Sequence, residues 1–287
     1  MKKHIILIPI YNDWKSLNKL LIDINEVFKN KTNIETKILI LNDNSTEVTK
    51  IDNKGLGSIK EINLLSVKNN LGSQKIITVG LNYLSEMNED FYVTIIDGDG
   101  EDNPIEIEKM LNYAEKYNEH IITSNRKKRE ESLIIKILYK FHLLITYAFS
   151  LKWISFGNFS SFHSKNIKRI LSDNSAWYAY SSSIIKNCKI IRVYAKRESR
   201  YYDKSKLGIV GLIEHSLRIN VNFSNKIHFM SLVYFIIFFF ISPYQILNTT
   251  FFFMLLFYNL LIIYIKKKHF IENFTTINDL IKNISSV

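Results

Sequence analysis

The chain has 287 residues, 47% of them hydrophobic, which fits one large domain or one domain with an appendage. Its formal net charge of +11 indicates an anionic partner, such as nucleic acid, acidic lipid headgroups or a phosphorylated substrate. The single cysteine, Cys188, excludes an internal disulfide and a cysteine-rich zinc site. Because the sequence has no aromatic platform or recognition motif for nucleic acid, we expect no nucleic-acid partner.

The N-terminal part, up to about residue 125, alternates between patterns typical of buried strands and of amphipathic helices. Continuous apolar runs predict strands buried on both faces, at His4–Ile10, Thr36–Asp43, Ile59–Val67 and Asp90–Asp97. Apolar residues at helical spacing predict helices over Ser16–Phe28, Gln74–Ser85 and Asn103–Lys116. Strands that alternate with helices predict a parallel α/β sheet.

Two long apolar segments, Ile227–Ile241 and Ile246–Ile265, lie near the end of the chain. The second is long enough to cross a bilayer as a helix, and the first reaches that length with its flanks. A buried hairpin in a soluble core is the alternative, but it would need an unusually large core. Lys266, Lys267 and Lys268 follow the pair, whereas the turn between the segments has no positive charge, so both ends are expected in the cytoplasm.

These segments predict a division of the chain into three parts. We expect a cytoplasmic domain over residues 1–222, two transmembrane helices over 223–268 and a short cytoplasmic tail over 269–287. The protein would then be a multi-pass protein of the inner or plasma membrane.

Polar side chains follow three of the predicted strands, at the point where each strand ends. The three groups are Tyr11-Asn12-Asp13, Asn42-Asp43-Asn44-Ser45 and Asp97-Gly98-Asp99. In open α/β sheets, ligands bind at the carboxyl ends of the parallel strands. The three groups therefore predict one binding rim, although loop residues are often polar and could gather there by chance.

Four carboxylates, Asp97, Asp99, Glu101 and Asp102, lie within six positions directly after an apolar run. An Asp-x-Asp pair at a strand end offers hard oxygen ligands, which suit Mg²⁺ or Mn²⁺ together with substrate phosphates and water. Gly98, between the two aspartates, permits a tight turn and the close approach of a ligand. A solvated acidic turn is the alternative for the motif alone, but the other two strand ends favour a metal site at Asp97 and Asp99.

Six motifs, taken in chain order, resemble those of the family 2 glycosyltransferases, especially the branch of dolichyl-phosphate mannose synthases and undecaprenyl-phosphate glycosyltransferases. The motifs are IPIYND, LNDNSTE, NNLGSQKIITVGL, DGDGEDNP, SNRKKRE and RYYDKSK. Paired C-terminal membrane segments are also common in this branch. The resemblance runs along most of the chain and is specific for the family but not for the substrate.

The resemblance implies a GT-A type fold, a Rossmann-like and mainly parallel sheet flanked by helices, with a C-terminal transmembrane helical hairpin. It also implies a hexosyltransferase that moves a sugar with inversion from a nucleotide-sugar donor. The residues implied to bind the donor are Pro9, Tyr11, Asp13, Asp43, Gly72, Asp97 and Gly98. Mg²⁺ or Mn²⁺ at Asp97 and Asp99 would offset the negative charge that develops on the leaving nucleoside diphosphate.

The acceptor-side loop Phe156–Phe162, FGNFSSF, departs from the usual G-D-F-R-L of the branch. Asn158 replaces the acid and Ser160 replaces the arginine, and a neutral amide cannot be a general base. Transfer to a sugar hydroxyl normally requires a base, whereas transfer to an ionised phosphate does not. Either the acceptor is a lipid phosphate, or the base lies elsewhere, with Asp102 favoured over Glu101.

The expected acceptor contacts combine basic residues with the loop amide, because guanidinium groups bind phosphate oxygens in bidentate fashion. They are Arg126, Asn158, Arg200 and Lys206, and the expected catalytic residues are Asp99 and Asp102. We expect transfer to a polyprenyl phosphate on the cytoplasmic face of the membrane. The alternatives are transfer to a sugar hydroxyl of a lipid-linked saccharide in cell-surface polysaccharide assembly, and a non-catalytic membrane scaffold that retains the fold.

Overall fold

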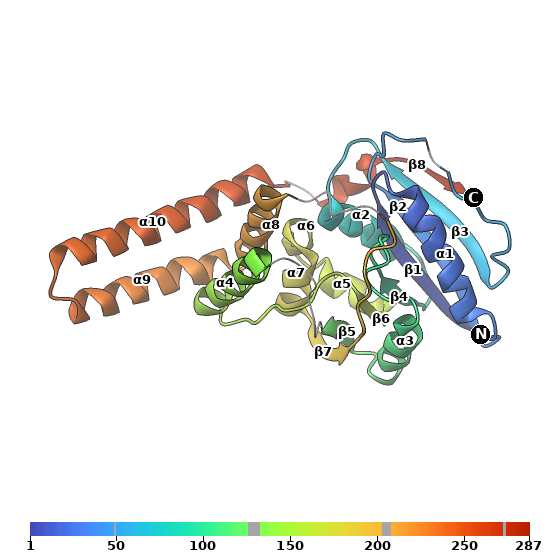
Figure 1. Ribbon diagram of the computed structural model, residues 1–287, viewed down its shortest axis with the longest axis horizontal. Coiled ribbons are helices and arrows are strands. Elements are labelled where there is room, and N and C mark those ends of the chain that lie inside the picture. The colour runs from blue at the N-terminus through green and yellow to red at the C-terminus, as the bar shows by residue number, and fades with distance from the viewer. Residues whose placement is uncertain (49, 126–132, 203–207, 272–273) are drawn as a thin grey trace. The chain divides into compact units, whose positions relative to one another are not determined.

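The computed structural model describes residues 1–48, 50–125, 133–202, 208–271 and 274–287, and it divides into two compact units (Figure 1). The first unit consists of Met1–Glu130, Ser155–Lys204 and Asn273–Val287, and the second consists of Glu131–Ile154 and Ser205–Glu272. This division differs from the one expected at residues 222 and 268. The second unit includes segments before residue 222, and the segment after residue 272 belongs to the first unit.

The first unit is built on a mixed sheet. Its strands in the described part of the chain are β1 (Lys2–Ile10), β2 (Ile34–Asn42), β3 (Ile59–Val67), β4 (Tyr92–Ile95), β5 (His120–Asn125), β6 (Ser160–His163), β7 (Lys189–Tyr194) and β8 (Ile281–Ser286). Their order in the sheet is β7-β5-β6-β4-β1-β2-β3-β8. Neighbouring strands are parallel except at β6, which is antiparallel to β4 and β5, and at β8, which is antiparallel to β3. The four strands expected from the N-terminal sequence are confirmed, and β6 and β8 make the sheet only mainly parallel.

Helices of the first unit lie on both faces of this sheet. They are α1 (Trp14–Phe28), α2 (Ser73–Ser85), α3 (Glu106–Lys116), α5 (Ile167–Ile170), α6 (Ser175–Tyr178) and α7 (Tyr180–Asn187), with the 3₁₀ turns η1 (Ser164–Asn166) and η2 (Phe274–Leu280). Because side chains alternate along a strand, Ile6 and Ile8 of β1 join the core cluster that contains the buried residues of α1 and α3. Leu7 faces α2, where a Cβ on Gly80 would lie 3.2 Å from its Cδ2 and 2.7 Å from Cδ1 of Leu41.

The helix boundaries follow from local polar contacts. Asp13 caps α1, because its Oδ1 accepts a hydrogen bond from the Ser16 amide at 3.4 Å. α3 begins three residues later than expected, at Glu106, because Asn103 and Pro104 form a turn in which the Asn103 side chain accepts from the Ile105 amide at 2.9 Å.

A buried polar chain links three neighbouring strands inside the sheet. His4 of β1 lies with its Nε2 2.8 Å from Oγ1 of Thr94 in β4, and the Thr94 hydroxyl donates to Oγ of Ser161 in β6 at 3.0 Å. All three residues are fully buried. The pKa of His4 is lowered from its ordinary 6.5 to about 3, first by burial and then by the nearby charge of Lys2, so His4 is neutral at pH 7.

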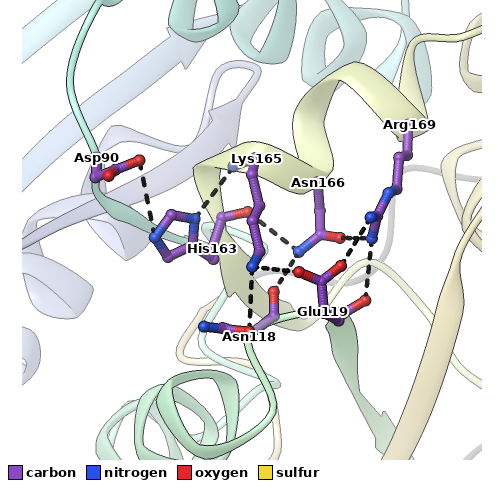
Figure 2. Close-up of polar contacts among 7 residues, drawn as sticks. All are labelled: Asp90, Asn118, Glu119, His163, Lys165, Asn166 and Arg169. Carbon is purple, nitrogen blue, oxygen red and sulfur yellow. Dashed lines mark hydrogen bonds and ion pairs between the residues drawn. The ribbon is translucent and has the colours of Figure 1, made fainter.

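A second polar cluster lies at the amino ends of β4 and β5 (Figure 2). The three polar groups expected to form a binding rim follow the carboxyl ends of strands, so this cluster lies at the opposite end of the strands from the rim. The carboxylate of Glu119 pairs with Lys165 at 2.5 Å and with Arg169 at 2.7 Å. Nδ2 of the buried Asn166 donates to the carbonyl oxygen of Asn118 at 2.9 Å. These contacts fix the segment that follows β6 against the start of β5, and they are structural contacts away from the rim.

The second unit consists of helices in the part of the chain that the structure describes. They are α4 (Leu133–Ser150), α8 (Ile209–Val221), α9 (Ser224–Ile241) and α10 (Gln245–Lys268). Both apolar segments expected to be helical are therefore helices, of 18 and 24 residues. Among the described residues, α9 and α10 are long and apolar enough to cross a membrane, and only 17% of each span is buried within the protein. This low burial disagrees with the alternative of a hairpin buried in a soluble core.

Aromatic and polar contacts join α9 to α10. The ring of Phe238 lies 4.4 Å from that of Phe251, centroid to centroid, and those of Phe235 and Phe252 are 5.3 Å apart. Nδ2 of Asn259 in α10 donates to Oγ of Ser231 in α9 at 2.8 Å. This hydrogen bond gives each of the two polar side chains a partner between otherwise apolar helices.

Candidate active site

The loops that follow β1 and β2 are tied to each other at the carboxyl ends of these strands. Asn12 has a positive φ of 52°, and its Oδ1 accepts from the backbone amides of Thr46 and Glu47 at 2.8 and 3.0 Å. The backbone amide of Asn12 donates to Oγ of Ser45 at 3.0 Å. Two of the three polar groups expected at the rim are therefore held side by side.

Asp43 lies at the end of β2 and is 4% exposed. Its two carboxylate oxygens accept from the backbone amides of Leu71 and Gly72, at 2.7 and 2.8 Å, just before α2 begins. Burial raises the pKa of Asp43 to about 6, although the two amides and the charge of Lys75 favour the ionised form. Asp43 therefore links the ends of β2 and of the loop before α2, and its expected contact with a nucleoside stays a prediction.

The third polar group, Asp97-Gly98-Asp99, follows β4 after one intervening residue, Ile96. A Cβ on Gly98 would lie 3.1 Å from the carbonyl oxygen of Pro9, so glycine lets this turn approach the end of β1. Asp97 accepts from Asn158 at 3.0 Å, and Asp99 pairs with Nη2 of Arg200 at 2.6 Å. The structure thus brings the expected metal ligands to the end of the strand next to β1.

Asp99 lies near both a negatively charged neighbour and two arginines. Burial and then the negative charge of Asp97 raise its pKa to about 6, while Arg200 and Arg197 act in the opposite direction. A divalent cation would add a positive charge beside the two carboxylates and favour their ionised forms.

We call residues 97–102 the acidic turn. We call residues 196–201 the basic strap, because this segment is hydrogen-bonded to the acidic turn and carries two arginines. Its backbone amides at Glu198 and Tyr201 donate to the carbonyl oxygens of Glu101 and Asp99, at 2.8 and 3.1 Å. Arg197 forms an ion pair with Glu101. Arg200, expected as an acceptor contact, pairs with Asp99 and lies 3.4 Å from Glu101. The strap therefore supplies positive charge directly to the acidic cluster.

Asp102, the expected general base, is 3% exposed and lies in an isolated antiparallel bridge with Arg197 of the strap. A general base must come within hydrogen-bonding distance of the proton it removes, and contacts of this kind often tighten only when substrate is bound. The role of Asp102 therefore stays a prediction.

Asn158, another of the expected acceptor contacts, is 9% exposed, and its side-chain amide donates to Asp97. Its Oδ1 accepts from Nε2 of Gln74 at 3.0 Å, and Gln74 was not among the residues expected at the site. Gln74 lies within the NNLGSQKIITVGL motif, but its contact with Asn158 spans 84 residues and no local pattern predicts it.

The remaining expected residues have different positions. Tyr11 is exposed, Asp13 caps α1, and Pro9 is part of β1. Arg126 and Lys206 lie outside the described residues. The strap residue Arg197 is one of the basic residues that precede the two apolar segments, but it was not among the expected acceptor contacts.

The metal-ligating capacity of this site rests on two carboxylates. In the described ranges, no group of three or more His, Cys, Asp or Glu side chains could hold a metal ion. Mg²⁺ and Mn²⁺ commonly use one or two carboxylates and complete their coordination with phosphate oxygens and water. Asp97 and Asp99 fit such a shared ion, and the guanidinium group already paired with Asp99 shows that this position accepts a positive charge.

The three-layer arrangement, with acidic residues after β4 and a polar rim formed by β1 and β2, is a GT-A type fold. The family model described as Glycosyl transferase family 2 matches residues 5–181, which is more than half of the chain. The chain belongs to glycosyl transferase family 2.

Three similar proteins give this family assignment its context. An uncharacterized protein of Methanocaldococcus jannaschii, MJ0544, is 26% identical over 144 residues, which cover 50% of this chain and 60% of the relative. Glucosyl-3-phosphoglycerate synthase from Mycobacterium tuberculosis, in complex with Mn²⁺, UDP and phosphoglyceric acid, has a TM-score of 0.50 and 14% identity and covers 78% of each chain. S. aureus TarS 1-349, in complex with UDP, has a TM-score of 0.47 and 17% identity and covers 79% of this chain and 65% of TarS.

These likenesses differ in what they show. The chain spans less than two thirds of the length of MJ0544 and of the TarS fragment. At 14% identity the M. tuberculosis synthase shares the fold with this chain, and its ligands are properties of that protein.

Proposed function

We propose that this protein transfers a sugar from a nucleotide-sugar donor to a membrane-linked acceptor. The observation that carries the proposal is the convergence of Asp43, Asp97 and Asp99 at neighbouring strand ends, beside the arginines of the basic strap. A nucleoside diphosphate carries both a polar nucleoside and a strongly anionic leaving group, and this rim offers ligands for each. The synthase that shares the fold at a TM-score of 0.50 binds Mn²⁺ and UDP, which supports a donor of this class.

Each group at the rim has a role that its position supports. Asp43 and the adjoining backbone would bind the nucleoside, and Asp97 and Asp99 would hold Mg²⁺ or Mn²⁺ together with the donor diphosphate. The ion would offset the charge that develops on the leaving diphosphate as the glycosidic bond breaks. Arg200, now paired with Asp99, would bind a phosphate oxygen when the cation takes its place at Asp99.

The acceptor that the site supports best is a polyprenyl phosphate, as in the branch of family 2 that the sequence resembles. Asn158 occupies the position of the usual acid, and its amide donates to Asp97 rather than facing outward as a base would. A phosphate oxygen is already ionised near neutral pH and needs no base for attack. The residues expected to bind it are Arg126, Lys206 and Arg200, with Asp102 as the base if the acceptor is a sugar hydroxyl.

The proposed membrane association rests on α9 and α10 and on the course of the chain around them. β7 precedes this hairpin and β8 follows it, and both belong to the sheet of the first unit. If the hairpin spans the membrane, both of its ends must therefore be on the side of the first unit. The lysines at residues 266–268 favour the cytoplasm as that side.

A donor and acceptor screen tests the proposed function. Purified protein in detergent with Mn²⁺ is offered a panel of nucleotide sugars, with polyprenyl phosphate or a lipid-linked saccharide as the acceptor. We expect release of nucleoside diphosphate with one donor and a larger release with polyprenyl phosphate. Transfer to the saccharide hydroxyl alone would contradict the acceptor assignment, and absence of release with every donor and acceptor would contradict the function.

A further inference from the structure

Four buried polar residues form a closed hydrogen-bonded ring next to Asp97. Nε2 of Gln74 donates to the side-chain Oδ1 of Asn158 at 3.0 Å. The backbone carbonyl oxygen of Asn158 accepts from Oγ of Ser160 at 2.9 Å. Ser160 Oγ lies 2.7 Å from the hydroxyl of Tyr180, whose backbone amide donates to Oε1 of Gln74 at 2.9 Å. The exposed fractions of these residues are 9% or less. Asn158 and Ser160, which stand in place of the acid and the arginine of the usual loop, both belong to this ring.

The direction of every amide in this ring follows from one group that cannot reverse. The backbone amide of Tyr180 can only donate, so the Gln74 oxygen must face it and the Gln74 nitrogen must face Asn158. The Asn158 oxygen then faces Gln74, and the Asn158 nitrogen is left to donate to Oδ1 of Asp97 at 3.0 Å. Orientations of side-chain amides are set by such networks.

Because the ring is buried, reversing the side-chain amide of Asn158 would cost free energy. If the Asn158 amide were reversed, its oxygen would face the oxygen of Asp97 and its nitrogen would face the nitrogen of Gln74. Both hydrogen bonds would be lost, and a buried polar group without a partner is not compensated for its lost hydration. A hydrogen bond to an ionised carboxylate is stronger than one between neutral groups. The ring therefore fixes the position of one Asp97 oxygen and leaves the second oxygen for another ligand.

We propose that the Gln74–Asn158–Ser160–Tyr180 ring is a positioning device for Asp97, with Asn158 the positioning residue and Gln74 the residue that sets its direction. This inference rests on the proposed function, because the ligand for which Asp97 is positioned is the metal-bound diphosphate of the donor. Asn158 acts through Asp97 and touches neither the sugar nor the acceptor. Its amide is then a donor-side feature, in place of the acceptor contact expected from the sequence.

Isosteric substitutions test the direction of the amides separately from packing. Gln74→Glu keeps the bond from Tyr180 but presents a second oxygen to Asn158, which must turn its nitrogen toward Glu and its oxygen toward Asp97. Asn158→Asp places a carboxylate oxygen directly against Asp97. Gln74→Met keeps the approximate volume and removes the constraint on direction. Thr78→Val is the matched control, because Thr78 is buried one turn further along α2 and its hydroxyl bonds only to the Gln74 carbonyl oxygen among the contacts described.

The measurement is the Mn²⁺ concentration that gives half-maximal binding of UDP, with GDP as a second probe, together with the melting temperature of each variant. We expect Gln74→Glu and Asn158→Asp to raise this concentration on the order of tenfold or more, Gln74→Met to raise it less, and Thr78→Val to leave it unchanged. If Asn158→Asp does not fold, the comparison of Gln74→Glu with Gln74→Met still tests the direction.

Two results would overturn the inference. One is UDP and Mn²⁺ binding by Gln74→Glu as tight as that of the wild type, and the other is a loss of binding that follows the melting temperature across all variants, Thr78→Val included. Failure of the wild-type protein to bind either nucleotide with Mn²⁺ is a different result, which would overturn the proposed function and the inference with it.

Discussion

At the scale of single residues, each carboxylate of the candidate site has its own partner in the protein. Asp43 accepts from two backbone amides, Asp97 from Asn158, and Asp99 pairs with Arg200. The acids themselves could be predicted, because they follow apolar runs at strand ends. Their side-chain partners could not, because the contacts of Asp97 and Asp99 connect positions 61 and 101 residues apart, and no local periodicity reports such pairings.

The buried His4 gives a pH dependence of stability at this scale. Its pKa is about 3 in the folded protein and near 6.5 in the unfolded chain, so between these values only the unfolded state takes up the proton. We expect the contribution of His4 to be complete above pH 6.5 and the free energy of unfolding to fall below it, by at most about 1.4 kcal/mol per pH unit. Denaturant unfolding of wild type and His4→Gln between pH 7 and pH 5 measures this. Equal losses of stability in the two proteins over this range would contradict the assignment.

At the scale of secondary structure, the sequence predicted the elements that have a strong period or a long apolar run. β1 to β4 and α1 to α3 belong to this class, and their boundaries differ from the expected ones by three residues at most. β6 and β8 were not predicted, because they are short and contain polar residues, and their place in the sheet depends on strands distant in the chain. The antiparallel β6 matters for the site because it carries Ser160, two residues after Asn158.

The contact between the acidic turn and the basic strap predicts an unusual sensitivity at Gly100. Gly100 has a φ of +81°, and a Cβ there would lie 2.3 Å from the ring of Tyr201. Gly55 is the control, because its φ is +77° but a Cβ added there would have no atom within 4 Å. We expect Gly55→Ala to cost about 1–2 kcal/mol for backbone conformation alone, and Gly100→Ala to cost clearly more because the strap must move. Thermal or denaturant unfolding measures both, and equal costs would show that the strap does not pack on the turn as described.

At the scale of the whole molecule, the chain leaves the first unit, forms the helical hairpin and returns to add β8 to the same sheet. The sequence predicted the two apolar helices from their length alone, but it treated the residues after 268 as a tail. A short, polar strand such as β8 has no signal of its own, because its stability comes from pairing with β3. If the hairpin spans a membrane, this return of the chain requires both ends of the hairpin to lie on the side of the first unit, whereas the charge pattern only favours that arrangement.

Cysteine labelling tests this topology in intact cells. In a Cys188→Ser background, we expect Gln245→Cys, at the start of α10 beside the hairpin turn, to react with a membrane-impermeant reagent from outside. Lys29→Cys, exposed in the first unit, should react only after permeabilisation, and a tag after Val287 should be accessible only from the cytoplasm. Labelling of Lys29→Cys in intact cells, or protection of Gln245→Cys, would contradict the proposed orientation.

We propose that Asp97 and Asp99 hold a divalent cation on which sugar transfer from a nucleotide donor depends. Release of nucleoside diphosphate, measured with and without chelator for wild type, Asp99→Asn and Asp90→Asn, tests it most directly. Asp90 is the matched control, because it lies just before β4 at the opposite edge of the sheet. We predict that chelator abolishes wild-type turnover, that Asp99→Asn lowers it on the order of 100-fold or more, and that Asp90→Asn leaves it unchanged. Full turnover in excess chelator, or in Asp99→Asn, would contradict the account.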